Sequence, residues 1–287
     1  MSSPSHTLGQ RGWLAGLRGE VAKLPAFFRR DLLMAFSYRI AFFADWFNLL
    51  LQILVFFLIS RLIDPSKLPS FGGRQVSYAE FATVGIAIAS FMQIGLTRVM
   101  GSVRGEQLMG TLETLFSTPT SPTTIQIGSV TYDIVYVPVR TVVFLLLAAA
   151  VLNVHINLSG ILPTVGLLLV FVPLVWGIGM IGGAAMLTMR RGDTVVGFFM
   201  TALITGSTTY VPLNVMPSWA QGLVSLNPIS TALDAAREAL LGTGGWSATL
   251  PAMGKLLPMA LLSIAAGIVA FRMALARERR MGSLGLY

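Results

Sequence analysis

The sequence ILPTVGLLLVFVPLVWGIGMIGGAAMLTM, residues 161–189, contains no charged side chain. A helix needs about 20 mostly apolar residues to cross the hydrocarbon core of a bilayer. Within lipid, only helices and closed barrels satisfy all of their own backbone polar groups, and an apolar run of this length is typical of a helix. We therefore predict that this segment spans a membrane and that the chain is an all-α membrane protein.

The composition of the whole chain agrees with this prediction. Of its 287 residues, 54% are hydrophobic and 11% are charged, whereas globular domains carry about 25% charged residues. The chain has no cysteine, which excludes disulfides, thiol catalysis and cysteine-ligated metals, and its two histidines, His6 and His155, are too few for a histidine metal site. We attribute the net charge of +8 to arginines on the cytoplasmic face of a membrane protein and expect no nucleic-acid partner.

Five further segments approach the length of a span: residues 40–60, 79–97, 126–152, 194–211 and 252–271. No polar stretch between them is long enough to fold as a soluble domain. We predict one six-span domain over residues 25–271, flanked by an N-terminal tail (1–24) and a C-terminal tail (272–287). No cleavable signal peptide precedes the first span, so we expect the N-terminal tail to remain and to be cytoplasmic.

The distribution of basic residues predicts the orientation of these spans. With both termini in the cytoplasm, fourteen of the 20 Lys and Arg residues fall in cytoplasmic segments, five fall outside, and Arg140 lies within the third span. Cytoplasmic loops carry the excess of Lys and Arg in membrane proteins. We therefore expect both termini, and the loop between the second and third spans, to lie in the cytoplasm.

Two cytoplasmic segments have the pattern of short amphipathic helices. In the first, residues 25–39, apolar and basic side chains recur at helical spacing: Phe28, Leu32, Ala35 and Phe36, with Arg29, Arg30 and Arg39. We favour a helix that lies in the lipid headgroup region over a simple lead-in to the first span. The second, GEQLMGTLETLFSTPTSP (residues 105–122), ends in two prolines and is too short to be a stable helix alone. It either rests on its own bundle as an ordinary loop or docks a partner.

Two motifs resemble those of the membrane subunits of type-2 ABC exporters, the ABC-2 permease family. The first matches E-x-x-x-G-T-L-E-x-L-x-x-T-P between the second and third spans: Glu106, Gly110-Thr111-Leu112-Glu113, Leu115 and Thr118-Pro119. The second matches P-x-x-x-[LM]-P-x-W followed by L-N-P after the fifth span: Pro212, Met216-Pro217, Trp219 and Leu226-Asn227-Pro228. With the six spans and the N-terminal helix, the resemblance covers nearly the whole chain.

The resemblance implies that the first motif is a cytoplasmic coupling helix, seated on a separate ATP-binding subunit. The residues implied for this contact are Arg104, Glu106, Leu108, Leu112, Glu113, Leu115 and Phe116. The chain has no G-x-x-x-x-G-K-[ST] phosphate loop, so we expect it to have no cofactor and no enzymatic activity of its own. ATP and magnesium are expected on two copies of the partner ATPase, beside a second permease chain, like or unlike, in the plasma membrane of a prokaryote (the inner membrane if Gram-negative).

The second motif is implied to form a re-entrant helical hairpin before the last span. The residues implied for this outer gate are Pro212, Met216, Pro217, Trp219, Asn227 and Pro228. Within the hairpin we predict a helix with Asn227 as its N-cap and Pro228 in its first turn. Its apolar face is Ile229, Leu233, Ala236 and Leu240, and we expect Asp234, Arg237 and Glu238 to contact water.

Polar side chains within the spans either line a path or hydrogen-bond the helices together, because each costs about 2.5–3.5 kcal/mol at the bilayer centre when charged. We favour a translocation path for residues of the first and fifth spans: Asp45, Asn48, Gln52, Thr201, Thr205 and Thr208. For Asp133 and Arg140, which share a face of the third span, we favour a structural role in which the two charges offset one another.

We expect the cargo to be amphipathic or lipid-like: a drug, a natural product or a lipid. Export of a lipid-linked glycan or polysaccharide by the same architecture is the first alternative. An ion-coupled secondary transporter is more distant, because Asp45 and Asp133 are acidic candidates but no internal repeat accompanies them. An intramembrane serine protease is disfavoured, since the only loop histidine, His155, follows the third span.

Overall fold

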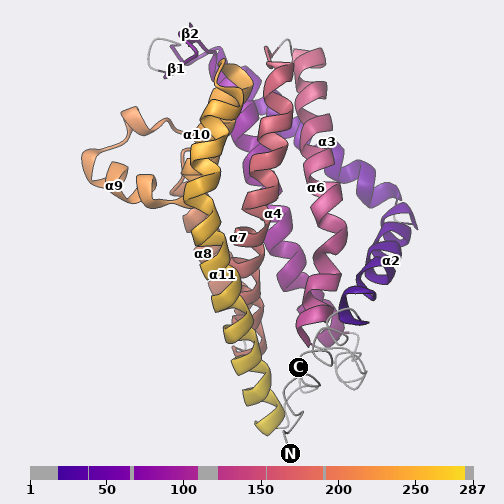
Figure 1. Cartoon of the computed structure of the whole chain (residues 1–287). Helices are drawn as coiled ribbons and strands as arrows, with labels where there is room; N and C mark the ends of the chain where they lie inside the picture. Colours follow the sequence, from indigo (N-terminus) through magenta and orange to yellow (C-terminus); the bar gives the residue numbers. More distant parts are fainter. Residues whose placement is uncertain are drawn as a thin grey trace, which may run out of the picture.

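The computed structural model describes residues 19–37, 39–64, 68–108, 122–152, 154–189 and 192–281. This part of the chain is mostly helical (Figure 1). In chain order its helices are α2 (Leu24–Ser37), α3 (Arg39–Ser60), α4 (Tyr78–Leu108), α6 (Pro122–Leu152), α7 (Ile161–Thr188), α8 (Gly192–Thr205), α9 (Ser218–Leu226), α10 (Pro228–Leu241) and α11 (Gly245–Met281), with 3-10 turns η2 (Leu158–Gly160) and η3 (Leu213–Val215).

Four of these helices, α4, α6, α7 and α11, contain segments long and apolar enough to cross a bilayer. The segments are Tyr78–Thr97, Thr131–Ala150, Leu158–Thr188 and Gly245–Glu278. Shorter apolar segments, Trp46–Ser60 and Thr194–Thr205, lie in α3 and α8. The chain is therefore a multi-pass helical membrane protein, which confirms the predicted class.

Several predicted helix boundaries differ from the structure. The fifth apolar segment, expected to reach residue 211, ends with α8 at Thr205. The hydroxyl of Ser207 donates to the carbonyl of Ile204 at 2.6 Å and accepts from the amide of Thr209 at 3.3 Å. Hydroxyl side chains that bond to nearby backbone in this way compete with helical hydrogen bonds, so the chain turns here. The last helix, in contrast, runs beyond both predicted ends, from Gly245 to Met281.

A small β-hairpin departs from the expected all-α fold. Strands β1 (Ser70–Phe71) and β2 (Arg74–Gln75) pair antiparallel between α3 and α4. The two residues between them, Gly72 and Gly73, have φ angles of 55° and 76°. A two-residue hairpin turn favours glycine because both residues need positive φ. The Gly-Gly pair was a hairpin signal in the sequence that the search for spans did not use.

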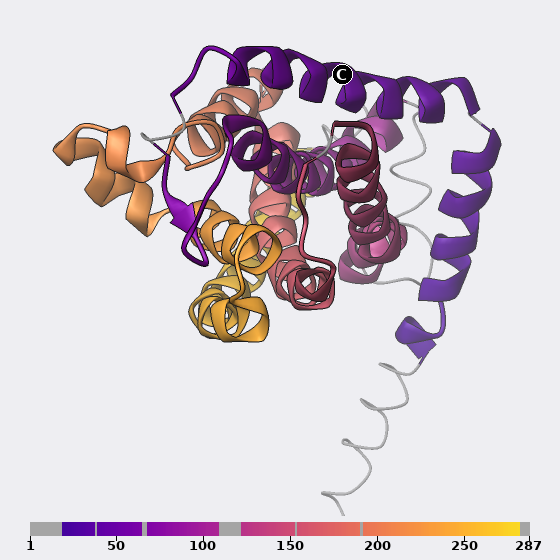
Figure 2. The same cartoon turned by 90° about the horizontal axis from the view of Figure 1, so that it is seen from above.

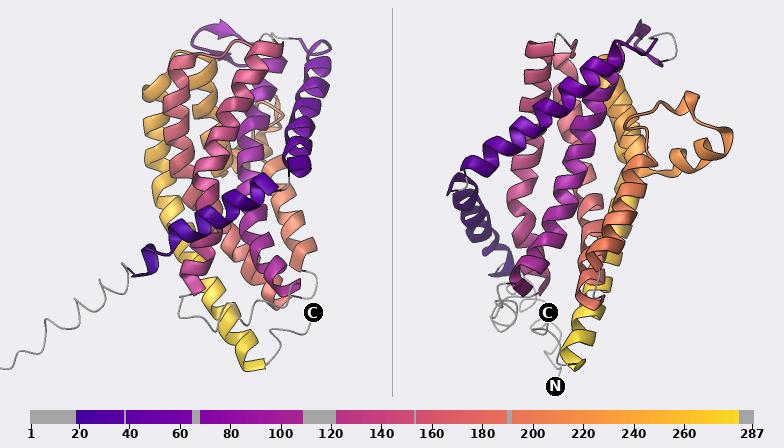
Figure 3. Two further views of the ribbon diagram at one scale, coloured as in Figure 1. Left: turned by 90° about the vertical axis from the view of Figure 1, so that its right-hand side faces the viewer. Right: turned by 180° about the vertical axis from the view of Figure 1, so that it is seen from behind.

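The helix ends fall on two opposite ends of the bundle. The end of α4, the start of α6 and the end of α11 lie at one end, and α2 begins nearest to it (Figures 1 and 3). The β-hairpin and the connection from α6 to α7 lie at the other end. Seen from above, α2 and α3 meet at a corner outside the main bundle (Figure 2).

Helices α7 and α11 run side by side through most of the bundle, in closer contact than any other pair (Figure 1). A side chain at Gly177 would collide with the backbone of Ser263 and Ile264, and one at Gly267 would lie 2.6 Å from the carbonyl oxygen of Gly177. The hydroxyl of Ser263 also donates to the carbonyl of Leu174 at 3.2 Å. Small residues thus let the two backbones touch, as in many membrane helix pairs.

We expect Gly177→Ala to destabilise the protein by about 1–3 kcal/mol, because the added methyl group forces the two helices apart. The measurement is the thermal unfolding midpoint of the purified protein in detergent. Gly254→Ala is the matched control on α11, where nothing lies within 4 Å of an added Cβ. Alanine favours helix over glycine by up to about 1 kcal/mol, so the control should not lose stability. Equal midpoints for both variants would contradict this packing.

Candidate functional site

Helix α10, the second helix of the predicted gate, is buried in the bundle against α4, α7 and α11. All four residues of its predicted apolar face, Ile229, Leu233, Ala236 and Leu240, are fully buried. Ala232 and Ala239 are fully buried as well. The predicted face is confirmed, but contacts surround the helix on more than that one face.

Asn227 joins the start of α10 to the end of α8. Its side-chain oxygen accepts from the amide of Ile229 at 3.0 Å, which confirms the predicted N-cap. Its side-chain nitrogen donates to the carbonyls of Leu203 and Gly206, each at 2.9 Å. Leu203 lies in the last turn of α8 and Gly206 directly follows the helix, and carbonyls at a helix end have no partner in the helix itself. The side-chain amide of Asn227 therefore pairs with backbone groups at the end of α8 and at the start of α10, and holds these two helix ends next to each other.

Arg237, near the middle of α10, is held on several sides. Its guanidinium carbon lies 3.5 Å from the centre of the Phe81 ring, and its Nε donates to the Phe81 carbonyl at 3.3 Å. Its Nη2 donates to the carbonyl of Thr209 at 3.0 Å, and its Nη1 reaches the hydroxyl of Thr208 at 3.4 Å. The Thr208 hydroxyl in turn donates to Asp234 at 3.0 Å. We call Phe81, Thr208, Thr209, Asp234 and Arg237 the arginine cluster.

The expectation that Arg237 contacts water is wrong, because its side chain is fully buried. The Asp234 carboxylate is 55% exposed and lies 3.7 Å from the guanidinium. Gly85 on α4 makes this arrangement fit, since a Cβ there would meet the Thr209 carbonyl and Arg237 Nη2.

A second buried charge, Glu80, directly precedes Phe81, the residue against which Arg237 packs. The amide of Ser77 donates to Glu80 at 2.8 Å, and the amide of Glu80 donates to the Ser77 hydroxyl at 3.2 Å, which forms a capping box at the start of α4. Glu80 also pairs with Arg74 of β2 at 2.9 Å and accepts from the amide of His155 at 3.3 Å. The S-x-x-E spacing before an apolar run signals such a cap, but the sequence analysis did not identify it.

The α6–α7 connection holds the far end of α10. The backbone amide of Asn157 donates to the carbonyl of Leu240 at 2.7 Å. The side-chain nitrogen of Asn157 donates to the carbonyl of Gly242 at 3.1 Å. Gly160 packs so closely on the carbonyl of Ala239 that any side chain there would collide. Helix α10 is therefore fixed at its start, its middle and its end.

The predicted gate residues are divided between this packed region and the surface. Pro212 and Asn227 are buried, and Met216 and Pro228 are half-buried. Pro217 and Trp219 are exposed at the start of α9, which projects from the bundle (Figure 1). The structure thus does not gather all six into one cluster.

The predicted path residues are also dispersed. Asn48 is exposed and Gln52 half-buried on α3, while the side chain of Asp45 lies outside the described part. Thr201 and Thr205 are exposed on α8, and the Thr201 hydroxyl donates to the carbonyl of Gly197 at 2.9 Å. Thr208 belongs to the arginine cluster.

Asp133 and Arg140, for which we favoured a structural role, are both buried on α6. The Arg140 guanidinium lies 5.8 Å from the centre of the Trp46 ring of α3, within cation–π range. Arg140 thus contacts the first apolar helix as well as its own.

The predicted coupling residues fall at or beyond the edge of the described chain. Arg104, Glu106 and Leu108 belong to the last turns of α4, whose side chains are not described there. Leu112, Glu113, Leu115 and Phe116 lie outside the described residues.

Comparison with protein families identifies the class to which this bundle belongs. The family model for the ABC-2 type transporter matches residues 8–241. The chain is therefore a member of the ABC-2 type transporter family, a transmembrane subunit of an ABC transporter, and members of this family work with ATP-binding cassette ATPases. A search of curated proteins gave no match to this chain.

We expect Arg237→Lys to lower the stability of the protein by about 1.5–3 kcal/mol. Lysine keeps the charge but has no planar fork, so at least one charge-assisted hydrogen bond to the Phe81 or Thr209 carbonyl is lost. The thermal unfolding midpoint measures this loss. Arg61→Lys, at the exposed end of α3, is the matched control and should change stability by less than about 0.5 kcal/mol. An unchanged midpoint for Arg237→Lys would show that the arginine cluster does not hold α10.

Proposed function

We propose that this chain is the membrane subunit of an ATP-driven exporter in a prokaryotic plasma membrane, which moves amphipathic or lipid-like molecules outward. The observation that carries the proposal is the family match over residues 8–241. Six membrane helices, with α3 and α8 as the shorter two, and cytoplasmic termini complete the proposed topology. The ATP and magnesium sites would be on a separate ATPase.

The coupling contact is proposed for residues 105–122, between α4 and α6. This is supported by the flanking helices: α4 continues to Leu108, past the apolar segment Tyr78–Thr97, and α6 starts at Pro122, ahead of the apolar segment Thr131–Ala150. Both helices therefore extend beyond their apolar segments at the same end of the bundle (Figure 1). Arg104, Glu106 and Glu113 would form charge pairs there, and Leu108, Leu112, Leu115 and Phe116 would fill an apolar groove of the ATPase.

The outer gate is proposed for α9, α10 and the turn before them. The hydrogen bonds of Asn227 support a broken helix in which α8 and α10 cross the membrane in succession. Within a membrane, irregular backbone is tolerated only where protein buries it, and the buried side chains of Ser207, Thr208 and Thr209 meet that requirement. Movement of α10 would have to break the contacts of the arginine cluster, so we propose that this cluster stabilises the closed gate.

A second permease chain is proposed to complete the path. The exposed surfaces of α8 and α9 are strongly apolar, with Phe198, Phe199, Trp219 and Leu223 between 59% and 79% exposed. Patches of this kind mark interaction surfaces. Thr201 and Thr205 on α8, and Asn48 and Gln52 on α3, are the polar residues we propose for the path.

The deciding experiment is co-purification of the chain with a candidate ATPase, followed by a test of whether substrate-stimulated ATP hydrolysis requires this subunit. We expect Glu113→Arg to reduce coupled transport at least tenfold while the subunit still folds, because the reversal replaces a charge pair with repulsion. Glu20→Arg makes the same charge change on the same proposed side, outside the coupling segment, and should transport normally. Full transport by Glu113→Arg with the ATPase bound would exclude the coupling role.

The proposed orientation has its own test, which the absence of native cysteines simplifies. In intact cells a membrane-impermeant maleimide should label Ser70→Cys, in the exposed hairpin. It should label Thr114→Cys, in the proposed coupling segment, only after the membrane is permeabilised. The reverse pattern would place the coupling segment outside and contradict the exporter topology.

A further inference from the structure

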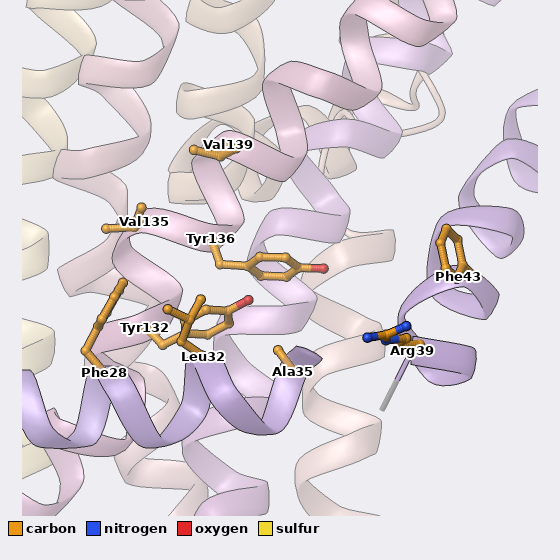
Figure 4. Close-up of a pocket in the computed structure, with 9 residues that line it drawn as sticks. All are labelled: Phe28, Leu32, Ala35, Arg39, Phe43, Tyr132, Val135, Tyr136 and Val139. Atoms are coloured by element: carbon orange, nitrogen blue, oxygen red, sulfur yellow. The ribbon is translucent and has the colours of Figure 1, made fainter. Parts of the chain in front are cut away.

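The N-terminal helix α2 and the first apolar helix α3 leave a pocket between themselves and α6 (Figure 4). Its volume is about 580 Å³, within the range of about 300–1,000 Å³ typical of small-molecule sites. Phe28 and Leu32 of α2, Arg39 and Phe43 of α3, and Tyr132 and Tyr136 of α6 lie around it. Among the residues that the structure describes, no predicted gate, path or coupling residue lines it.

The pocket exists because α3 leans away from the bundle towards its N-terminal end. Near its other end, Phe56 of α3 stacks on Tyr210 with ring centres 5.4 Å apart and also contacts Tyr78 at 6.3 Å. At the N-terminal end, Ile40, Phe43 and Phe47 are 88%, 68% and 63% exposed. Helix α2 covers one side of the space between α3 and α6, where Phe28 contacts Tyr132 with ring centres 5.9 Å apart.

The start of the apolar segment of α6 lies beside the pocket, which indicates a position near the boundary of the membrane. The apolar segment of α6 starts at Thr131, immediately before Tyr132, and α3 starts at Arg39. Tyrosine and arginine are typical of this boundary, where their apolar parts face acyl chains and their polar ends face headgroups. In Figure 4 the Tyr136 hydroxyl and the Arg39 guanidinium point towards one another across one side of the pocket.

The lining has one charge, and it is positive. In the described part of the chain no acidic side chain lines the pocket, and the rest of the lining is apolar apart from the two tyrosines. The neighbouring arginine of α2, Arg30, is already paired with Asp31 at 2.8 Å and lies over the Phe27 ring. An occupant must therefore combine an apolar body with an anionic end beside Arg39.

We propose that the pocket between α2, α3 and α6 is a binding site for an anionic phospholipid that stays with the protein. Its phosphate pairs with the Arg39 guanidinium, and an acyl chain lies along Leu32, Val135 and Val139. Anionic lipids are enriched in the cytoplasmic leaflet, the side on which we propose α2 to lie. The lipid would fill the space between α3 and the bundle.

The test uses the full-length chain, without its ATPase, in phosphatidylcholine vesicles that contain a trace of phosphatidylglycerol with a photoactivatable acyl chain. Cross-linked peptides are identified by mass spectrometry. We expect labels on residues 28–43 and 132–139, and about tenfold less labelling there in Arg39→Gln, which corresponds to the loss of one charge-assisted hydrogen bond. Arg29→Gln, an exposed arginine of α2 outside the pocket, is the matched control and should label like the native chain.

A second pair of variants tests the site if Arg39→Gln does not fold. Val139→Trp fills the pocket from an exposed position of α6 and should abolish the labels on α2, while Val143→Trp, one turn further along, should leave them. Equal loss in Arg39→Gln and Arg29→Gln, or equal labelling by a photoactivatable phosphatidylcholine, would overturn the site. Loss of labelling when the lipid is photoactivated after ATP turnover with the partner bound would identify a transported cargo and would overturn a resident lipid. Because binding is measured on this chain alone, its failure is distinct from a failure of the exporter function.

Discussion

The burial of Arg237 is the constraint on which the half of the bundle around α10 depends. A guanidinium without partners in an apolar interior is so unfavourable that the surrounding chain has to supply acceptors for it. Here the acceptors are the Phe81 carbonyl of α4 and the Thr209 carbonyl of the turn after α8, with the Phe81 ring below the guanidinium. One side chain of α10 thereby joins three separate segments.

The same interaction explains the broken path of the chain between α8 and α11. The turn after α8 presents carbonyls inward, and Arg237 and Asn227 take up several of them, so irregular backbone can lie inside the protein. Gly85 and Gly160 allow α4 and the α6–α7 connection to approach the turn and α10 without side chains between them. The close packing around α10 contrasts with that of α3, whose N-terminal end leans away from the bundle beside the pocket we assign to lipid.

These two regions suggest different roles in a transport cycle. Helix α10 is fixed by hydrogen bonds at both ends and its middle, so it would move only in a discrete step that breaks them together. Helices α2 and α3 contact the bundle mainly through apolar surfaces, which adapt to small shifts. A force applied between α4 and α6 by an ATPase would reach α10 through α4, which carries both Phe81 and Gly85.

The sequence by itself determined the class and family of the protein. Apolar length, the capping residue Asn227 and the apolar face of α10 are local patterns, and local patterns follow from helix geometry alone. Sequence reasoning placed Arg237 in water, because an arginine on a helix with one apolar face is usually exposed. It also extended α8 through Ser207, beyond the end of the helix at Thr205. The predicted gate and path residues lie at separate places in the fold, and their roles stay predictions. Only the tertiary structure decided these points, since the partners of Arg237 lie on helices distant in sequence and exist only once the bundle has packed.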